Sequence, residues 1–416
     1  MSDNGPARHA ERTGTTELHL KGSALHDVVV IGGGPAGAMT AYRLADRGHD
    51  VVLLEEHASI GSPVHCTGLM GVDAFSDFDL PRDVILGEAV TARFWGAAGQ
   101  SVAATSARLR PVIIDRAAFD QQLAARAEAA GADIRRGCRA ETVSVGSNAV
   151  AITVGVDRPV VRARACVLAC GASYRFHRAL GLGLPDLFLQ SAQLETPFPS
   201  RPEIEVRFGR EVAPSGFAWL VPVDRAAVPH ARIGLMSATK VRQRFAALLT
   251  QLCASAGMDP AAVPAPRLKM LPLGPVSRTY ADRVVAVGDA AGLVKPTTGG
   301  GIHYSLLSGS LAAETLDDAL RRDRLSAQSL ARYERRWRRR LGQEIRVGLA
   351  FRRLAARLSD DSIDEIIELA RVNGVIPLLQ ETATFNWHRK AAIALLGHPA
   401  FRRIVFKSLA WRDSVI

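Results

Sequence analysis

Cysteine is scarce in this sequence, and long hydrophobic runs are missing from it. The 416 residues include five cysteines, and no two of them form a Cys-x-x-Cys pair. This pattern excludes a disulfide-stapled scaffold and a zinc or thioredoxin-like redox site, so we predict no metal and a location in the reducing cytoplasm. No apolar run approaches the roughly 18 residues that span a bilayer. A soluble globular protein with a large core is therefore expected.

Acidic side chains are also in deficit. The sequence has 52 Lys and Arg against 41 Asp and Glu, a formal net charge of +11, and most of the basic residues are arginine. Such a charge suits nucleic acid, an anionic membrane surface or acidic ligands, and it says nothing about the fold. Because no base-reading motif accompanies the arginines, we expect no nucleic-acid partner.

The first pattern that carries chemistry is a glycine turn near the N-terminus. A β-branched run at 26–31 predicts a strand buried on both faces of a parallel sheet, and it leads into Gly-x-Gly-x-x-Gly at 32–37 and a helix-forming stretch. Gly32 permits a tight turn, Gly34 lets the backbone approach a pyrophosphate, and Gly37 allows the helix to pack closely on the strand. The pattern alone is also compatible with an ordinary glycine-rich turn.

A second strand makes the dinucleotide interpretation specific. The run Asp50–Leu54 predicts this strand, and it ends in Glu55, about twenty residues beyond the glycines, where a carboxylate would accept hydrogen bonds from ribose hydroxyls. A carboxylate at this position disfavours a 2′-phosphate, so NADP is not expected in this site. Strand, turn, helix, strand and acid in this order predict a dinucleotide site.

A second half-site lies about 250 residues further along the chain. Residues 282–287 predict another buried strand, which leads into Gly288-Asp289-Ala290-Ala291-Gly292, a glycine-rich loop and a long apolar helix. A carboxylate at a strand end suits a ribityl hydroxyl, and the helix start offers N–H groups to a phosphate or to the polar edge of a flavin. Two such sites favour one extended ligand, and FAD fits better than NAD.

These segments carry a resemblance to a known family. Together with the loop Ser62–Leu69, the segment Pro111–Phe119 and the run Phe217–Pro222, they resemble the geranylgeranyl reductase family of FAD-dependent oxidoreductases, within the flavoproteins built like aromatic hydroxylases. The resemblance implies an enzyme that passes hydride from reduced FAD to C=C bonds of a polyprenyl lipid, a quinone or a related isoprenoid. NADPH, a reduced ferredoxin or a separate reductase remain open as electron donors.

The resemblance also implies site residues. The expected cofactor contacts are Gly32, Gly34, Ala36, Gly37, Glu55, Cys66, Thr67, Gly68, Arg116, Ala140, Asp289, Pro296, Gly300, Gly301 and Ile302. The expected substrate contacts are Phe217, Trp219 and Pro222. Cys66 is the candidate catalytic residue because its thiol could help to deliver a proton beside the flavin, and the alternative is a small buried hydrophobic side chain. Phe217 and Trp219 are equally compatible with ordinary core packing.

Departures from related patterns bear on the alternatives. The family has Tyr at the position of Phe217 and an aromatic residue at the position of Val221. The sequence therefore does not define the shape of the substrate pocket. The segment 169–173 lacks the Asp-Gly of NADPH-using hydroxylases, so a flavin monooxygenase acting on an apolar or aromatic substrate is the second hypothesis. A flavin-dependent halogenase, which needs a lysine, is disfavoured because no lysine occurs between Lys21 and Lys240. A flavin-containing binding protein without enzymatic activity is the third hypothesis.

The expected fold class is α/β, a Rossmann-like FAD-binding domain with a parallel sheet, an inserted mixed or antiparallel sheet for the substrate, and a helical C-terminal region. The expected boundaries follow from the order of the patterns along the chain. They are a flexible lead-in at 1–25, the FAD-binding domain at 26–70, 105–172 and 278–320, the substrate domain at 71–104 and 173–277, and the helical region at 321–416.

One basic segment has two interpretations. Residues 332–357 combine an apolar stripe that includes Trp337 with ten arginines and two glutamates. The segment predicts either a helix packed on the body with a solvated basic face, which we favour, or a helix lying on an anionic membrane surface. The second interpretation would place the protein peripherally on the inner face of the membrane, near an apolar substrate.

Overall fold

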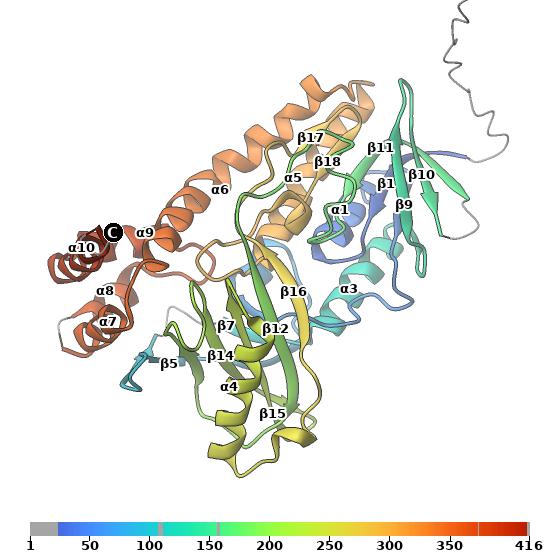
Figure 1. The fold of residues 1–416 in the computed structure, drawn as a ribbon. Helices are drawn as coiled ribbons and strands as arrows, with labels where there is room; N and C mark the ends of the chain where they lie inside the picture. Colours follow the sequence, from blue (N-terminus) through green and yellow to red (C-terminus); the bar gives the residue numbers. More distant parts are fainter. Residues whose placement is uncertain (1–23, 107–110, 156–158, 373, 414–416) are drawn as a thin grey trace, which may run out of the picture.

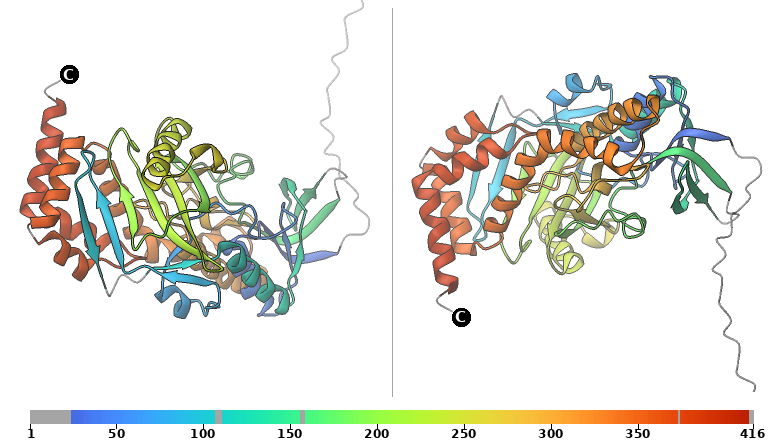
Figure 2. Two further views of the ribbon diagram at one scale, coloured as in Figure 1. Left: turned by 90° about the horizontal axis from the view of Figure 1, so that it is seen from below. Right: turned by 90° about the horizontal axis from the view of Figure 1, so that it is seen from above.

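The computed structural model describes residues 24–106, 111–155, 159–372 and 374–413, which form two large sheets, a small sheet and a set of C-terminal helices (Figure 1). The predicted lead-in at 1–25 lies outside these residues except at its end, because the first strand already begins at Leu25. The last helices (orange to red) lie at the end of the molecule opposite to β9 and β10 (Figure 2).

The first sheet has eight strands and a parallel centre. Its parallel strands, in spatial order, are β18 (Val284–Ala286), β11 (Val160–Leu168), β1 (Leu25–Ile31), β2 (Val51–Leu54) and β8 (Asp133–Arg135). The antiparallel strands β17 (Tyr280–Ala281), β9 (Ala140–Val145) and β10 (Val150–Val154) complete it. The central strands are unbroken apolar runs, as expected for a parallel sheet whose two faces are both covered.

Helices α1 (Pro35–Ala45), α3 (Arg116–Ala129) and α5 (Ile302–Arg321) pack beside this sheet. α5 approaches α1 closely at Gly309, where an added Cβ would lie 2.6 Å from the carbonyl oxygen of Ala36. α3 begins at Arg116, where the Asp115 carboxylate caps the N–H groups of Ala117 and Ala118.

The second sheet has seven mostly antiparallel strands. In spatial order they are β16 (Arg267–Pro272), β12 (Phe188–Pro197), β15 (Val228–Ser237), β14 (Phe217–Arg225), β13 (Ile204–Arg207), β5 (Thr91–Trp95) and β6 (Ser101–Thr105). Helix α4 (Val241–Ala256) covers one face, where Phe245 and Leu248 pack against Ala218 and Leu220. The opposite face is therefore left for the cavity described below.

A small sheet connects the two large ones. It contains β3 (Leu69–Gly71), β7 (Pro111–Ile114) and β4 (Ile85–Glu88), and the short helix α2 (Asp73–Asp77) follows β3. Two 3-10 turns, η1 (Pro260–Ala262) and η2 (Gly288–Ala291), complete the list of short elements, and η2 carries the second glycine segment. The side chains of Ile113 in β7 and Val221 in β14 share one apolar cluster, so the small sheet joins the substrate-side sheet to the rest.

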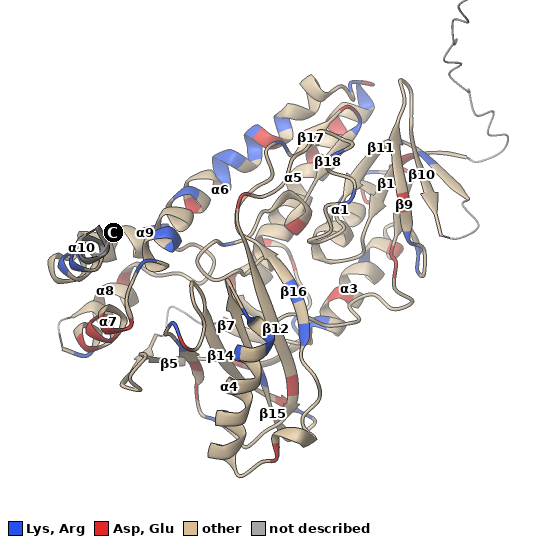
Figure 3. Cartoon of the chain, viewed as in Figure 1, with Lys and Arg blue, Asp and Glu red and all other residues tan. Residues whose placement is uncertain are grey.

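The C-terminal region is helical, as expected. It consists of α6 (Ala327–Ala355), α7 (Asp360–Val372), α8 (Val375–Thr382), α9 (Arg389–Gly397) and α10 (Pro399–Asp413). The apolar stripe of α6 is buried on the body, and Trp337 is 1% exposed and donates a hydrogen bond from Nε1 to Thr279. Basic residues recur along α6 (Figure 3), and most of its arginines are exposed, whereas Arg352 is buried. Trp337 therefore cannot reach lipid headgroups, and the packed-helix interpretation describes this stripe.

The structure also bears on membrane insertion. Within the described parts of the chain, no helix combines the length and the apolar composition that a membrane crossing requires.

Candidate active site

The two glycine segments lie at the same edge of the parallel sheet. Strand β1 pairs with β11, and β11 pairs with β18, so Ile31, Leu168 and Ala286 mark strand ends that lie side by side. At the usual strand spacing, the ends of β1 and β18 are about 10 Å apart. An added Cβ on Gly288 would lie 2.9 Å from the Cβ of Ala36, so the turns that follow the two strands are in contact. Ligands of such sheets bind beyond these carboxyl ends.

The three glycines of the first turn have different surroundings. Gly32 has φ +108°, and a Cβ there would lie 2.4 Å from the carbonyl oxygen of Ala169. A Cβ on Gly37 would lie 1.9 Å from the carbonyl oxygen of Gly32, so only glycine allows α1 to sit this close to β1. A Cβ on Gly34 would meet no atom within 4 Å. Gly34 therefore borders open space at the uncapped N-terminus of α1, where free N–H groups favour an anion.

Glu55 is 8% exposed and reaches back to the glycine turn. Its Oε2 accepts a hydrogen bond from the N–H of Gly33 at 2.8 Å, and its Oε1 accepts one from the N–H of His57 at 3.0 Å. The His57 ring also lies 2.6 Å from Oε1 through Nδ1. These contacts fix the carboxylate beside the turn, on the wall of the cavity.

The second glycine loop is tightly closed. The N–H of Lys295 donates to the Gly300 carbonyl at 3.0 Å, and the N–H of Gly299 donates to the Lys295 carbonyl at 2.8 Å. α5 then begins with Gly301 as its N-cap and without a side-chain cap, so its N–H groups also face the cavity. Asp289 lies beside this loop and pairs with Lys269 at 3.4 Å.

Cys66 lies on the cavity wall. Its sulfur accepts a hydrogen bond from the N–H of Gly68 at 3.3 Å, and the thiol also interacts with the Arg116 guanidinium. Burial would lower the pKa of Arg116, but its ion pair with Asp120 at 2.8 Å, together with Cys66, outweighs burial and raises it. Arg116 is thus a fixed cation next to the thiol.

A buried ion network holds the Cys66 loop from the second sheet. Arg232 on β15 is 1% exposed and donates to the carbonyls of Thr67 at 2.7 Å and Ile114 at 3.0 Å, and to the Glu195 carboxylate at 2.7 Å. Glu195 also pairs with Arg225. Burial would raise the pKa of Glu195, but the two guanidinium groups outweigh it and lower that pKa. The loop is therefore fastened to the sheet by charge-assisted hydrogen bonds.

This network predicts an unequal response to loss of two arginines of the same sheet. We expect Arg232→Met to lower the free energy of unfolding by about 3–5 kcal/mol, because it leaves buried acceptors without their donor. The matched control is Arg93→Met, which removes a partly exposed arginine paired with Glu203. It should cost about 1 kcal/mol or less. Urea denaturation measures both, and equal losses would contradict the assignment.

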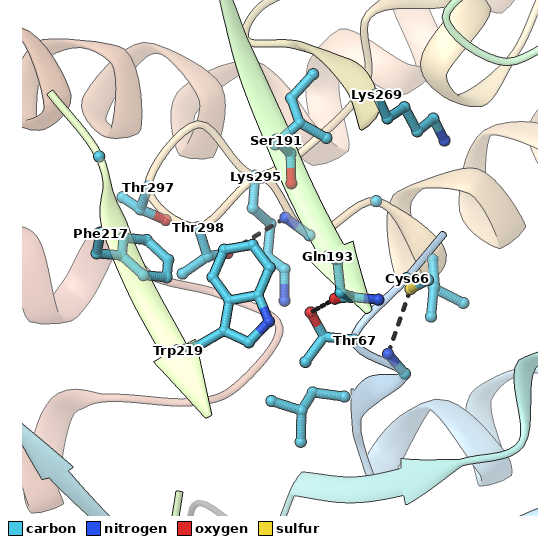
Figure 4. Close-up of a pocket in the computed structure, with 18 of the residues that line it drawn as sticks. Cys66, Thr67, Ser191, Gln193, Phe217, Trp219, Lys269, Lys295, Thr297 and Thr298 are labelled. Carbon is cyan, nitrogen blue, oxygen red and sulfur yellow. Dashed lines mark hydrogen bonds between the residues drawn. The ribbon is translucent and has the colours of Figure 1, made fainter. Parts of the chain in front are cut away.

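A single cavity of about 1620 Å³ joins these parts. Ligand pockets usually have about 300–1,000 Å³, so this cavity exceeds the needs of one small molecule. From the glycine turns it passes the side chains shown in Figure 4 and continues into the C-terminal helices. The apolar end is lined by Phe351, Ile363, Ile366, Ile367, Ala370, Val375, Ile376, Leu379, Leu395 and Phe401.

Trp219 on β14 lines the cavity. An added Cβ on Gly234 of the next strand would lie 2.4 Å from the indole, so this glycine lets the ring lie flat on the sheet. Phe217 packs edge-on against it, with ring centroids 5.8 Å apart. The indole N–H is buried and has no hydrogen-bond partner among the described residues.

Most of the residues expected from the sequence line the cavity, and three do not. The lining residues are Gly32, Gly34, Ala36, Glu55, Cys66, Thr67, Gly68, Arg116, Ala140, Phe217, Trp219, Asp289, Gly300, Gly301 and Ile302. Gly37 does not line the cavity and instead allows α1 to pack closely on β1. Pro222 does not line the cavity, because it shares the strand parity of Ala218 and Leu220, which face α4. Pro296 packs under α6, where its carbonyl accepts a hydrogen bond from Arg352.

Several lining residues were missed. Lys295 lies inside the second glycine segment, which the sequence predicts to bind the dinucleotide. Nothing in the sequence indicates that its amine is buried in the cavity. The lining residues of α7, α8, α9 and α10 come from a region that the sequence predicts only to be helical. Their apolar periodicity signals a buried face but does not say against what it is buried.

Comparisons with known proteins agree on the family. The family model described as lycopene cyclase protein matches residues 27–369. The chain is 31% identical to digeranylgeranylglycerophospholipid reductase 2 of Methanothermobacter thermautotrophicus over 82% of this chain and 91% of the relative. It is 30% identical to the protein of the same name from Methanopyrus kandleri over 85% of this chain and 92% of the relative.

Solved structures show the same fold. A geranylgeranyl bacteriochlorophyll reductase-like protein from Thermoplasma acidophilum matches with a TM-score of 0.78 and 23% identity, over 93% of this chain and 99% of that chain. A halogenase mutant in complex with FAD matches with a TM-score of 0.65 and 17% identity, over 94% and 93%. The predicted fold class is thereby confirmed.

The fold and the two glycine turns first define a dinucleotide-binding α/β protein with a large apolar cavity. The sequence matches are more specific, since they cover most of the chain at about one residue in three. The chain belongs to the lycopene cyclase protein family as that model defines it and, within it, to the geranylgeranyl reductases. The family predicted from the sequence is confirmed.

Proposed function

We propose that this chain is an FAD-dependent reductase that adds hydrogen across C=C bonds of a polyprenyl lipid. The observation that carries this proposal is the continuity of one cavity from two glycine turns, which suit a dinucleotide, to an apolar end formed by the C-terminal helices. The relatives named digeranylgeranylglycerophospholipid reductase support the same substrate class.

The residues at the polar end fit FAD. A Cβ on Gly34 would point into open space, and the start of α1 has no side-chain cap and no acidic residue in its first turn, so a pyrophosphate could approach its N–H groups. Glu55 would accept hydrogen bonds from the adenosine ribose, and Asp289 from the ribityl chain. The start of α5 at Gly300, Gly301 and Ile302 would offer N–H groups to the flavin ring.

FAD, when bound, supplies the hydride chemistry, and the chain supplies orientation and a dry cavity. Phe217 and Trp219 form walls that would exclude water from the prenyl chain beside the flavin. Cys66 is the candidate that holds a proton near the reacting carbon, because its thiol lies on the cavity wall beside Arg116. We propose NADPH or a reduced ferredoxin as the electron donor.

We also propose a division of labour along the chain. Residues 26–70, 105–172 and 278–320 carry the cofactor end, while 71–104 and 173–277 carry one wall of the substrate cavity. The helices of 321–416 carry its apolar end. The exposed arginines of α6 offer a basic face to an anionic membrane that contains the substrate, and the protein would then be cytoplasmic and peripheral.

The test is reduction of defined lipids under strictly anaerobic conditions. The holoenzyme, with chemically reduced FAD, is incubated with geranylgeranyl lipids and polyprenyl quinones, and the products are analysed by mass spectrometry. We expect a gain of two hydrogens for each double bond reduced. Turnover that requires oxygen and adds an oxygen atom would select a monooxygenase, and no change in any of these lipids would remove the proposed substrate class.

A further inference from the structure

Lys295 is a buried cation without a carboxylate partner. Its side chain lines the cavity and is 7% exposed. The ammonium donates one hydrogen bond to the Phe385 carbonyl at 2.9 Å and lies 4.5 Å from the centre of the Phe385 ring. Of the carboxylates in the described ranges, none comes within 4 Å of Nζ. A buried charge without a counter-ion is costly, so its presence calls for a reason.

The other titratable groups around Lys295 do not neutralise it. His303 at the start of α5 and His388 after α8 both face it, and burial, reinforced by Lys295, lowers the pKa of His303 to about 4 and that of His388 to about 3. Both imidazoles are therefore neutral at physiological pH. Asp73 on α2 interacts with Lys295 at longer range, and its carboxylate is already engaged by Asn386 at 2.6 Å.

A second buried cation nearby makes a useful contrast. Arg352 on α6 also lacks a carboxylate partner among the described residues, but it donates to the carbonyls of Pro296, Ser215 and Thr297. Its donors are used to fasten the loop. Among the residues that the structure describes, Lys295 has a single carbonyl partner, so two of the three donors of its ammonium are left for a ligand.

The position of the Lys295 amine indicates which ligand it would contact. An added Cβ on Gly300 would lie 2.9 Å from Cε of Lys295 and 3.5 Å from Nζ. The amine thus borders the loop that, under the proposed function, receives the flavin ring. Figure 4 shows Lys295 among the side chains around the pocket, with Trp219, Thr67 and Gln193. A prenyl chain carries no charge, whereas a flavin becomes negative when it takes up two electrons and one proton.

We propose that Lys295 is the counter-charge of the reduced cofactor. The ammonium of Lys295 stabilises the anionic two-electron-reduced flavin where the flavin lies on the glycine loop. This inference rests on the proposed function. NADPH or ferredoxin supplies the two electrons, one proton goes to N5, and the negative charge remains on the ring beside Lys295. Burial lowers the pKa of Lys295 to about 8, so the amine is charged at neutral pH before the anion forms.

The experiment compares the flavin midpoint potential of the holoenzyme in wild type, Lys295→Met, Lys295→Arg and the control Lys390→Met, in which an exposed lysine of α9 is lost. We expect Lys295→Met to bind reduced FAD about tenfold more weakly relative to oxidised FAD. For a two-electron couple this is a fall of about 30 mV. Lys295→Arg should retain most of the wild-type potential, and Lys390→Met all of it.

Stability separates this role from a structural one. Methionine replaces a buried unpaired charge, so Lys295→Met should unfold at the same or a higher temperature than wild type. Because the folded pKa of Lys295 lies below the usual value of 10.5, the gain in the apoprotein should be full below about pH 8 and vanish as the pH rises toward 10.5.

The outcomes are distinguishable. An unchanged potential in Lys295→Met, or an equal loss of affinity for oxidised and reduced FAD, overturns the inference and leaves the proposed function standing. Failure of the wild-type chain to bind FAD overturns the proposed function first.

Discussion

Gly34→Val should fold like the wild type and lose its affinity for FAD by about a hundredfold or more. The backbone at Gly34 is extended, with φ −70° and ψ −179°, and a Cβ there meets no atom within 4 Å, so valine fits the protein itself. The same side chain would fill the space through which a pyrophosphate approaches the start of α1. A hundredfold loss corresponds to about 3 kcal/mol of binding free energy.

Two other glycines make this prediction specific. Gly87 in β4 also has free space at its Cβ position but does not line the cavity, so Gly87→Val should bind FAD normally. Gly37→Val should fail to fold, because its side chain would collide with the backbone of Gly32. Fluorescence titration with FAD and circular dichroism measure the two properties. Wild-type affinity in Gly34→Val would show that the dinucleotide lies elsewhere.

The parts of this site that sequence reasoning predicted are those specified by neighbours along the chain. The turn at Gly32–Gly37 has its strand before it and its helix after it, so its structure follows from local sterics. The same holds for Glu55 at the end of β2. The pairing of the two half-sites needed one further rule, that parallel strands end at the same edge of a sheet.

The parts that were missed depend on contacts between distant segments. Whether Pro222 faces the cavity or α4 depends on which face of β14 the helix covers, and the run Phe217–Pro222 does not contain that information. The absence of lysine between Lys21 and Lys240 did not keep an amine out of the cavity, since Lys295 enters from the second glycine loop. That absence alone therefore does not decide against halogenase chemistry.

The apolar end of the cavity also depends on contacts between distant segments, and this dependence has a consequence for function. Its walls come from α7, α8, α9 and α10 and from the end of α6, which follow the dinucleotide segments in sequence. Arg352 and Gly348 of α6 fasten this helix to the loop at Pro296 and Thr297, which brings these walls to the cofactor end. Hydrogen bonds from Lys295 to Phe385 and between Thr297 and His388 add to this contact. A longer prenyl chain should then reach further along the cavity into the C-terminal helices.

Ala370→Phe should therefore change the preferred chain length. Ala370 on α7 lines the apolar end, and a phenyl ring there would occupy the space of the terminal part of a long prenyl chain. Each methylene displaced from an apolar pocket is worth about 1–3 kcal/mol, so kcat/KM for a geranylgeranyl substrate should fall about tenfold to a hundredfold. We expect a geranyl substrate, which has half as many isoprene units, to end before this position, so its kcat/KM should stay within about twofold of wild type. Ala350→Phe, on the exposed side of α6, is the matched control and should alter neither value. Equal losses for both substrates in Ala370→Phe would mean that the prenyl chain does not enter the C-terminal helices.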